Sequence, residues 1–426
     1  MRESTGTPAP DRLYLPSTVL VMSLGHLLAF VDRAKVAGVL PAIRAQIPMT
    51  DTAAAAVIGT AFATAYVVTL LLLTIAERGR ERGWRWRLLA GVVIWGIATA
   101  VTGLADTLPE LLGARALLGV GQALFIPAAL TSVVTASPSR AARAANLAIF
   151  TAAASFGRSA GLLVIGGALA LVQWLSLSST DQAWRWSFIA TVVPNLLLLG
   201  LLRTPLVSFV QAPAAAETGL RVAWRAQAMF MLLALMPIML IQATVGWLPT
   251  LLVSEYAVTV QQASYWAGAI VLVAGPTGQL IGGWLLRRLK PPSRAVPWII
   301  ASAMTVGLPG FIPVASGSGM RLAAIGMSWA YFALGIAGLA ALYGWQDLMP
   351  QRVRLAGNGL YLALVTAVAI GLGPLLTGLI ADQAAALPVA LLKTALVCTS
   401  VALLIAVLRR TRLATPRGQS RSVAND

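Results

Sequence analysis

Long apolar segments separated by short polar gaps run along almost the whole chain. Twelve of these segments are long enough to span a bilayer as helices, because about 20 apolar residues cross the ~30 Å hydrocarbon core. The predicted helices are 15–43, 52–76, 87–105, 108–136, 143–173, 185–203, 223–253, 258–286, 295–316, 319–346, 355–381 and 385–409. The pattern therefore predicts an all-α membrane protein with twelve transmembrane helices, and no strand alternation typical of a membrane β-barrel competes with it.

The polar gaps alternate between basic and acidic. The basic gaps hold Arg78, Arg80, Arg82 and Arg85; Arg140 and Arg143; Arg221 and Arg225; Arg287, Arg288, Lys290 and Arg294; and Arg352 and Arg354. The gaps between them hold Asp51, Asp106, Glu110, Asp181, Glu255 and Asp382. Because basic loops stay in the cytoplasm, we expect a multi-pass protein of the cell inner (plasma) membrane with both termini cytoplasmic.

A polar, proline-containing gap in mid-chain divides the helices into two sets of six. We expect a bundle at 1–203, a cytoplasmic linker at 204–222, a second bundle at 223–409 and a basic tail at 410–426. The two halves also share a pattern: Pro138, Arg140 and Asn146 correspond to Pro350, Arg352 and Asn358 at one offset of 212 residues (350 − 138). A duplicated six-helix unit is typical of transporters, whose substrate site lies between the repeats.

Composition supports a membrane protein and excludes several other classes. Of the 426 residues 58% are hydrophobic and 11% are charged, and the mean hydropathy is +0.82. The net charge of +17 comes from arginines in the gaps, so it indicates membrane topology rather than a nucleic-acid partner. One cysteine, Cys398, and one histidine, His26, exclude an internal disulfide and a histidine-rich metal site. No hydrolase motif is present, so we expect neither an enzyme nor a cofactor.

Several motifs resemble those of the major facilitator superfamily over essentially the full chain. The gap after the second helix reads LTIAERGRER from Leu73, which keeps the acidic–basic core of the family motif as Glu77 and Arg78 but loses both of its glycines. The segments WRWSFI at Trp184 and GWLPTLL at Gly246 resemble the starts of the sixth and seventh helices. The resemblance implies two six-helix bundles that alternate access, with Glu77 and Arg78 in conformational gating.

Within the superfamily, two branches match different segments. FVDRAKVAGVLPAI resembles the first helix of the Spinster-like transporters. TAFATAY, which ends at Tyr66, and WLPTLL resemble the anion:cation symporters, which move organic acids with protons. ARALLGVGQALFIPAA resembles the fourth helix of both branches, in which glutamate commonly stands where this chain has Gln122. The resemblance implies that Tyr66 and Gln122 contact the substrate.

Asp32, Arg33 and Lys35 lie within the first apolar segment, where an ionised group costs about 3 kcal/mol on insertion scales. Gly25, Ala29 and Asp32 share one helical stripe, so we expect Asp32 to face inward. We interpret Asp32 as the proton-coupling residue and Arg33 as a substrate contact. The alternative is a permanent ion pair of Asp32 with an arginine or with Lys35. His26 lies on nearly the same stripe and is expected to hydrogen-bond a neighbouring helix.

Two further arginines are candidates for substrate binding. Arg115 stands one or two turns inside the fourth helix, where it can contact an anion or reach the outer interface. Arg158 occupies the centre of the fifth helix, whereas the residue at the repeat offset is Ile370, so the fold itself does not demand a charge there. The alternative for Arg158 is an ion pair with Asp32. Gly157 and Gly161 follow the small-xxx-small spacing of helix packing.

Positive charge outweighs negative charge within the predicted spans, and this balance favours an anionic cargo. We therefore predict a secondary transporter that moves a small organic anion by alternating access, coupled to protons, as a monomer in the lipid bilayer. The alternatives are a Spinster-like transporter of a lysophospholipid or similar anionic amphiphile, and a non-transporting membrane sensor. Gln122 cannot titrate, which leaves proton coupling dependent on Asp32.

Overall fold

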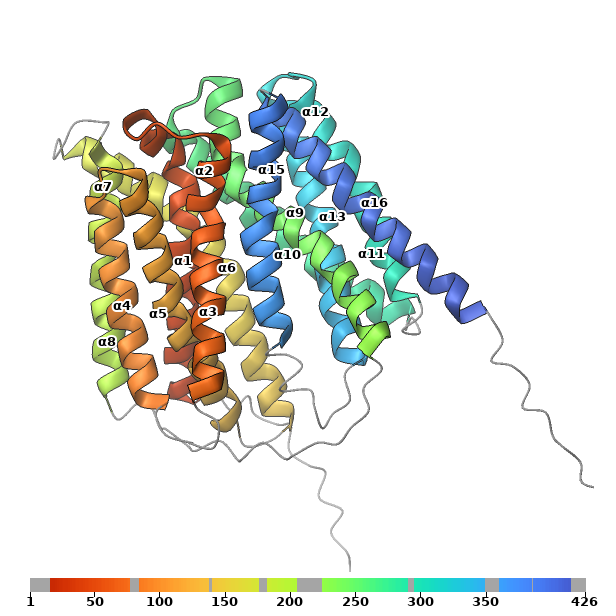
Figure 1. The fold of residues 1–426 in the computed structure, drawn as a ribbon, viewed down its shortest axis with the longest axis horizontal. Coiled ribbons are helices and arrows are strands. Elements are labelled where there is room, and N and C mark those ends of the chain that lie inside the picture. Colours follow the sequence, from red (N-terminus) through yellow and green to blue (C-terminus); the bar gives the residue numbers. More distant parts are fainter. Residues whose placement is uncertain are drawn as a thin grey trace, which may run out of the picture. The chain divides into compact units, whose positions relative to one another are not determined.

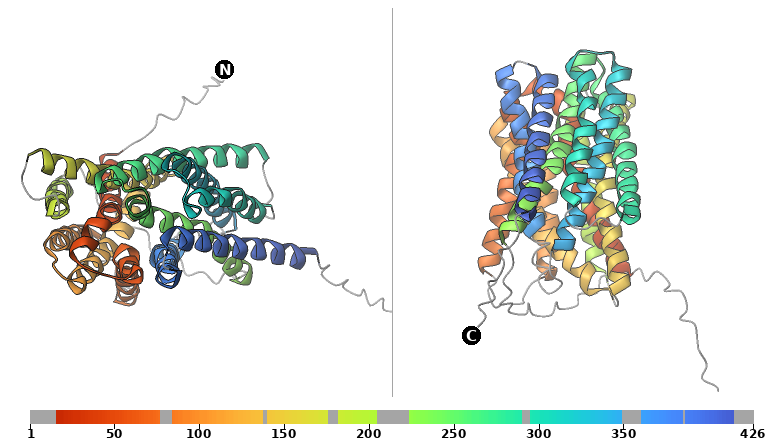
Figure 2. Two further views of the ribbon diagram at one scale, coloured as in Figure 1. Left: turned by 90° about the horizontal axis from the view of Figure 1, so that it is seen from above. Right: turned by 90° about the vertical axis from the view of Figure 1, so that its right-hand side faces the viewer.

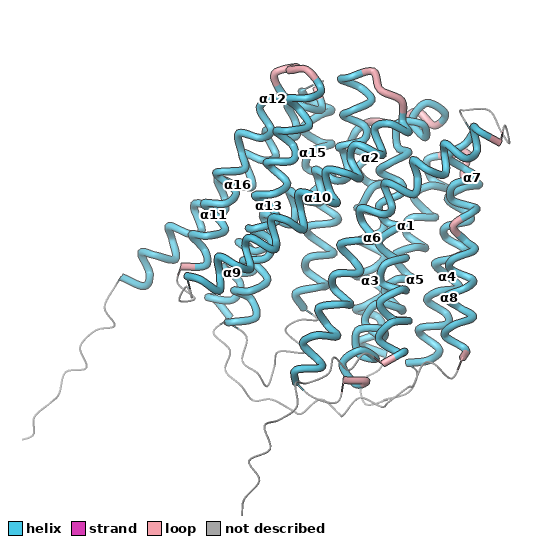
Figure 3. The backbone as a smooth tube through the Cα atoms, turned by 180° about the vertical axis from the view of Figure 1, so that it is seen from behind, coloured by secondary structure: helices cyan, strands magenta, loops and turns pink. Residues whose placement is uncertain are grey.

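The computed structural model describes residues 16–76, 84–137, 140–175, 182–204, 224–289, 295–348, 360–384 and 386–414. Every regular element in these ranges is a helix, and Figure 3 shows helices joined by short loops. Eleven of the described helices are long and apolar enough to cross a membrane. A twelfth long helix, α1 (Ser17–Gln46), differs from them because it carries Asp32, Arg33, Lys35 and Arg44. The predicted all-α fold of twelve helices is confirmed.

The chain divides into two compact units. The first comprises Met1–Glu217 with Gly246–Leu272, and the second comprises Thr218–Val245 with Val273–Asp426. The predicted linker, 204–222, lies almost wholly outside the described residues, and the last helix continues to Ala414, into the segment expected to be a tail. Because the first unit includes Gly246–Leu272, the end of the seventh predicted helix and the start of the eighth belong to it.

The helices of the first unit are labelled in Figure 1. They are α1, α2 (Asp51–Ala55), the π-helical turn η1 (Ala56–Thr60), α3 (Ala61–Ala76), α4 (Trp84–Leu104), α5 (Leu108–Thr135), α6 (Arg140–Trp174), α7 (Ala183–Ala190) and α8 (Val192–Arg203). Helix α1 packs along α6 and also contacts α5 and α8, while α4 packs against α5. This arrangement places α1 at the centre of the unit's contacts.

The second unit is built from the remaining helices. They are most of α9 (Trp224–Tyr256) and α10 (Val260–Leu289), then α11 (Val296–Gly307), the 3₁₀ turn η3 (Leu308–Phe311), α12 (Ile312–Ala315), α13 (Met320–Leu348), the π-helical turn η5 (Val365–Ile370), α15 (Gly371–Ala384) and α16 (Leu387–Ala414). Helices α15 and α16 lie side by side, as both views of Figure 2 show, and α11 packs against α13.

Four of the predicted helices are interrupted rather than continuous, among them the eleventh, which contains the π-helical turn η5. The sixth breaks at Thr191 into α7 and α8. The ninth tightens into the turn η3 after Gly307, because Pro309 has no N–H to continue the α-helical hydrogen bonds. The second contains the π-helical turn η1, which leaves backbone carbonyls for partners outside the helix. One of these interruptions, η1, belongs to the candidate site.

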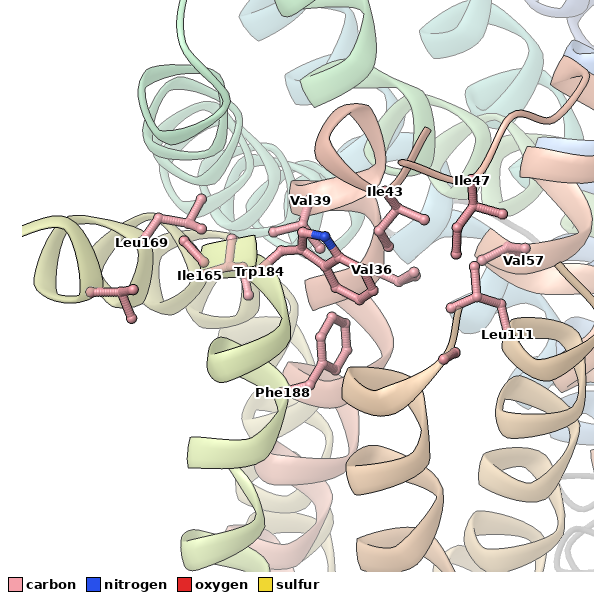
Figure 4. Close-up of a cluster of buried hydrophobic side chains, with 13 residues drawn as sticks. Val36, Val39, Ile43, Ile47, Val57, Leu111, Ile165, Leu169, Trp184 and Phe188 are labelled. Carbon is pink, nitrogen blue, oxygen red and sulfur yellow. The ribbon is translucent and has the colours of Figure 1, made fainter. Parts of the chain in front are cut away.

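An apolar cluster fixes one half of α1 within the first unit (Figure 4). Val36, Val39 and Ile43 are fully buried in this cluster. They pack with buried side chains that other helices of the unit contribute, among them Ile165, Trp184 and Phe188. Burying a side chain of this size contributes about 1.5–3 kcal/mol. The ionisable stretch of α1 lies directly before this anchored half, so its register is set by the apolar cluster.

Candidate functional site

Two glycines of α6 bring α1 and α6 into backbone contact. A Cβ atom on Gly157 would lie 2.3 Å from the carbonyl oxygen of Leu27, and one on Gly161 would lie 2.7 Å from that of Val31. Neither position therefore accepts a side chain without moving α1. This agrees with the packing role predicted from the spacing of the two glycines, and it fixes the part of α1 that carries Asp32 and Arg33.

The Asp32 carboxylate is buried and fully occupied by neighbouring side chains. Its Oδ2 atom accepts hydrogen bonds from Trp95 Nε1 at 2.5 Å, from Asn195 Nδ2 at 3.1 Å and from Thr99 Oγ1 at 3.2 Å. Its Oδ1 atom forms an ion pair with Lys35, one turn further along α1. Asp32 thus joins α1 to α4 and α8. Its ion pair with Lys35 is one of the pairs that the sequence left as an alternative to proton coupling.

Lys35 is fully buried and completes the same cluster. Besides Asp32, its ammonium group donates to the hydroxyl of Thr191 and lies 4.8 Å from the ring centre of Phe188. Thr191 is the residue at which the predicted sixth helix breaks into α7 and α8. Burying an ammonium group in an apolar interior costs free energy unless the group has polar partners. The break of the helix at Thr191 supplies one such partner, a hydroxyl, to Lys35.

Arg33 points to the other side of α1, toward α3 and α5. Its Nε donates to Gln122 Oε1 at 2.5 Å, and Gln122 Nε2 donates to the backbone oxygen of Ala29 at 3.1 Å. The guanidinium carbon lies 4.4 Å from the ring centre of Phe62, 4.6 Å from that of Phe30 and 5.7 Å from that of Tyr66. The structure thus brings together Arg33, Tyr66 and Gln122, three of the predicted substrate contacts, within cation–π distance or hydrogen-bond distance.

Arg115 is only 1% exposed, and all of its hydrogen bonds among the described residues go to backbone oxygens. Its Nε donates to Val57 at 2.9 Å, Nη2 to Ile58 at 3.2 Å and Nη1 to the backbone oxygen of Asp32 at 3.4 Å. Val57 and Ile58 belong to η1, where the π-helical turn frees carbonyl groups. This geometry gives Arg115 a role in holding the second membrane helix against α1.

Replacing Arg115 by leucine is expected to destabilise the protein, because an unsatisfied buried carbonyl costs about 1–3 kcal/mol. Arg115→Lys is expected to recover part of the loss, since one ammonium group cannot reproduce the planar fork of a guanidinium. Apparent melting temperature in detergent is the measurement. If Arg115→Leu melts at the temperature of the wild type but loses affinity for the cargo, Arg115 contacts the anion, as the sequence predicted.

Arg158 of α6 lies near the Arg33 cluster through a shared ring. Its guanidinium carbon is 5.3 Å from the ring centre of Phe30, whose ring Arg33 also contacts, and the side chain is partly buried. His26 approaches the same region, with its ring 5.2 Å from Phe30. His26 Nδ1 donates to the backbone oxygen of Phe150 at 2.8 Å, which matches the interhelical hydrogen bond predicted for it. Two cations, Arg33 and Arg158, therefore flank one aromatic ring.

Two of the predicted residues, Glu77 and Arg78, lie outside the described residues. Sequence reasoning missed the partners that other helices supply. Trp95 and Asn195 bind Asp32, and Phe30 and Phe62 enclose Arg33. Asn195 carried a signal, because it is the only amide in the apolar helix α8. Phe30 and Phe62 carried none, since a phenylalanine in a membrane helix ordinarily faces lipid or core.

Comparisons with known proteins agree with this architecture. A family profile described as Major Facilitator Superfamily matches residues 22–374. The uncharacterised transporter EfpA of Mycobacterium tuberculosis is 33% identical over 214 residues, which are 48% of this chain and 37% of that protein. The chain thus spans little more than a third of that relative's length. The 3-(3-hydroxy-phenyl)propionate transporter of Escherichia coli is 28% identical over 330 residues, 70% of this chain and 71% of that one.

A solved structure has the same fold at low sequence identity. The inward-facing, unoccupied form of a bacterial homologue of the human lysosomal transporter Spinster superimposes with a TM-score of 0.78. It is 18% identical and covers 93% of this chain and 97% of its own. At this identity the likeness establishes the fold alone.

Proposed function

Because the chain belongs to the major facilitator superfamily, we propose that it is a secondary transporter whose cargo is an organic anion. The observation that carries the proposal is the setting of Arg33, whose contacts among the described residues are a neutral amide and three aromatic rings. A partly buried guanidinium held by neutral groups is complementary to a carboxylate or phosphate. Membership of a transporter family also sets aside the alternative of a non-transporting sensor.

The rings around Arg33 favour an anion with an apolar, ring-containing body. Phe30, Phe62 and Tyr66 offer faces against which such a body can pack while the guanidinium binds its acidic group. The Escherichia coli relative, by its name a transporter of a phenylpropionate, supports the same substrate class. The second candidate, a lysophospholipid, requires an anionic head and a long apolar chain, and it is supported by the segment of α1 that resembles the Spinster-like branch.

A transport assay separates these cargoes. Protein reconstituted in vesicles is expected to take up labelled phenylpropionate, and unlabelled aromatic carboxylates are expected to compete while the corresponding amides do not. The amides are matched controls because they keep the ring and lose only the charge. Uptake of the amide at the rate of the acid, or transport of lysophospholipid alone, would contradict the proposal of a small organic anion.

We further propose that transport is coupled to protons through Asp32. Asp32→Asn is expected to abolish accumulation driven by a pH gradient and to spare counterflow exchange, because exchange needs no net proton movement. The variant also leaves Lys35 without its ionised partner, so it must be compared with Asp32→Asn combined with Lys35→Met. If the double variant accumulates cargo like the wild type, Asp32 serves only the ion pair and coupling lies elsewhere.

The remaining parts of the proposal follow from charge pattern and family motif. The basic gaps and both termini are assigned to the cytoplasm, and Glu77 with Arg78 to the gate that opens and closes between conformations. Arg33, Tyr66, Gln122 and Arg158 are assigned to the cargo, with Arg115 positioning the helix that carries Tyr66. A monomer in the inner membrane is sufficient for this mechanism, which uses the two halves of one chain.

A further inference from the structure

An apolar groove of about 550 Å³ lies within the second unit, whereas the residues assigned to the cargo all belong to the first. Its lining comes from α11 between Ala295 and Val306, from α13 between Trp329 and Ile336, and from Leu285 of α10. No lining residue is ionisable; the polar groups are the hydroxyl of Ser302 and two indole rings. Such a lining does not suit an organic anion, but it suits a hydrocarbon chain.

The groove follows α11, a helix long and apolar enough to be part of a membrane span. Its wall along α11 runs from Ala295 to Val306, a rise of about 17 Å at 1.5 Å per residue. This is roughly half of the ~30 Å hydrocarbon core. Ser302 and Val306 are exposed on the surface of this membrane helix, and Trp329 is 47% exposed, so the groove is open along its side.

Trp329 marks the deep end of the groove. Its Nε1 donates to the backbone oxygen of Val306 at 2.8 Å, directly before α11 tightens into η3. This bond holds the indole across α11 and α13. The floor stays close to α10 because a Cβ atom on Gly278 would lie 2.0 Å from the backbone oxygen of Phe332. The groove is therefore a fixed feature of the helix packing and not a chance arrangement of flexible side chains.

A positive charge lies beside the shallow end. Arg288 follows Leu285 by three residues on α10, so it continues the same face of the helix by one turn. Its side chain is exposed, and its guanidinium carbon lies 5.3 Å from the ring centre of Trp284. An anionic headgroup at this level would meet Arg288 while its chain lies against α11. Such a pairing of a basic residue with an interfacial tryptophan is typical of the cytoplasmic membrane surface.

We propose that this groove binds one acyl chain of an anionic phospholipid from the leaflet on the side of the basic gaps, with the headgroup at Arg288. Purified full-length protein in mild detergent is mixed with phosphatidylglycerol or phosphatidylcholine of identical chains, and native mass spectrometry counts the bound lipids. Phosphatidylglycerol is expected to bind in preference. Arg288→Ala is expected to remove the preference. Arg321→Ala is expected to keep it, because Arg321 is exposed at the start of α13, on the far side of Trp329 from Ile336.

Filling the groove tests the acyl-chain part of the proposal. Ser302→Trp and Ala303→Trp are expected to weaken binding by at least about tenfold, the effect of losing a few buried methylene groups. The control Leu404→Trp, at a residue of α16 that is 58% exposed, is expected to bind like the wild type. Ser302 is exposed, so its substitution leaves the fold intact, and a melting curve checks this for each variant.

Any one of four outcomes would overturn the proposal, three of them seen directly in the mass spectra. These three are unchanged lipid binding by both filled variants, equal binding of the two lipids by the wild type, and a dimer whose mass peak disappears when the groove is filled. Competition of the lipid by phenylpropionate would also overturn it, because the groove would then belong to the cargo pathway. The first three results leave the cargo assignment at Arg33 unchanged, so failure of the lipid proposal and failure of the proposed function are distinguishable.

Discussion

Lys35→Met is expected to destabilise the folded protein by about 3–5 kcal/mol, the cost of removing one partner from a buried ion pair. Lys35 is fully buried, and its loss leaves the Asp32 carboxylate as an uncompensated charge between α1, α4 and α8. Asp32→Asn combined with Lys35→Met is expected to regain about half of the lost stability or more, because both charges are then absent. The donors Trp95 and Thr99 keep an acceptor in the asparagine carbonyl.

The measurement is the apparent melting temperature in detergent at one scan rate, since unfolding of a membrane protein is seldom reversible. Arg44→Met is the matched control on the same helix. Arg44 forms an ion pair with Asp51 at 2.6 Å, but its side chain is 29% exposed, and such pairs contribute about 0.2–1 kcal/mol. If the melting temperature of the double variant falls by the sum of the two single decreases, the two side chains act independently.

The twelve helices could be predicted because each spans the bilayer with apolar residues, a property of local sequence. Their interruptions could not, because the partners that satisfy the freed backbone groups come from elsewhere. The turn η1 depends on Arg115, 57 and 58 residues away from the carbonyl groups that it binds. The breaks near Pro309 and at Thr191, three residues before Pro194, are the exceptions, because a proline has no N–H with which to continue the helix.

The candidate site shows the same division. The stripe of Gly25, Ala29 and Asp32 predicted that Asp32 is buried, and the structure gives it 3% exposure. Which cation it meets was undecided from the sequence, since Arg33 and Lys35 are both near in the chain. The structure decides it through α4 and α8, whose side chains hold the carboxylate on the Lys35 side of α1. Arg33 lies on the other side of α1 and contacts side chains of α3 and α5 instead.

Arg33→Ala is expected to lower the affinity for the anionic cargo by about 100-fold, because it removes a charge-assisted contact from a partly buried site. Arg33→Lys is expected to recover only part, because an ammonium group cannot make a two-pronged contact. Both variants are expected to insert and fold, since the partners of Arg33 are a neutral amide and rings that need no cation. Arg44→Ala is again the control for loss of an α1 arginine.

Arg158→Ala is expected to lower the affinity for the same cargo, because Arg158 and Arg33 flank the ring of Phe30. If both arginines hold one anionic group, the double variant loses less affinity than the sum of the single losses, and the difference is their coupling energy. Cargo affinity measured in detergent beside a melting curve gives both quantities. Should Arg158→Ala unfold the protein, and Asp32→Asn with Arg158→Ala restore it, Arg158 serves a structural ion pair. The anion is then bound by Arg33 alone, and its affinity depends on the rings that enclose that guanidinium.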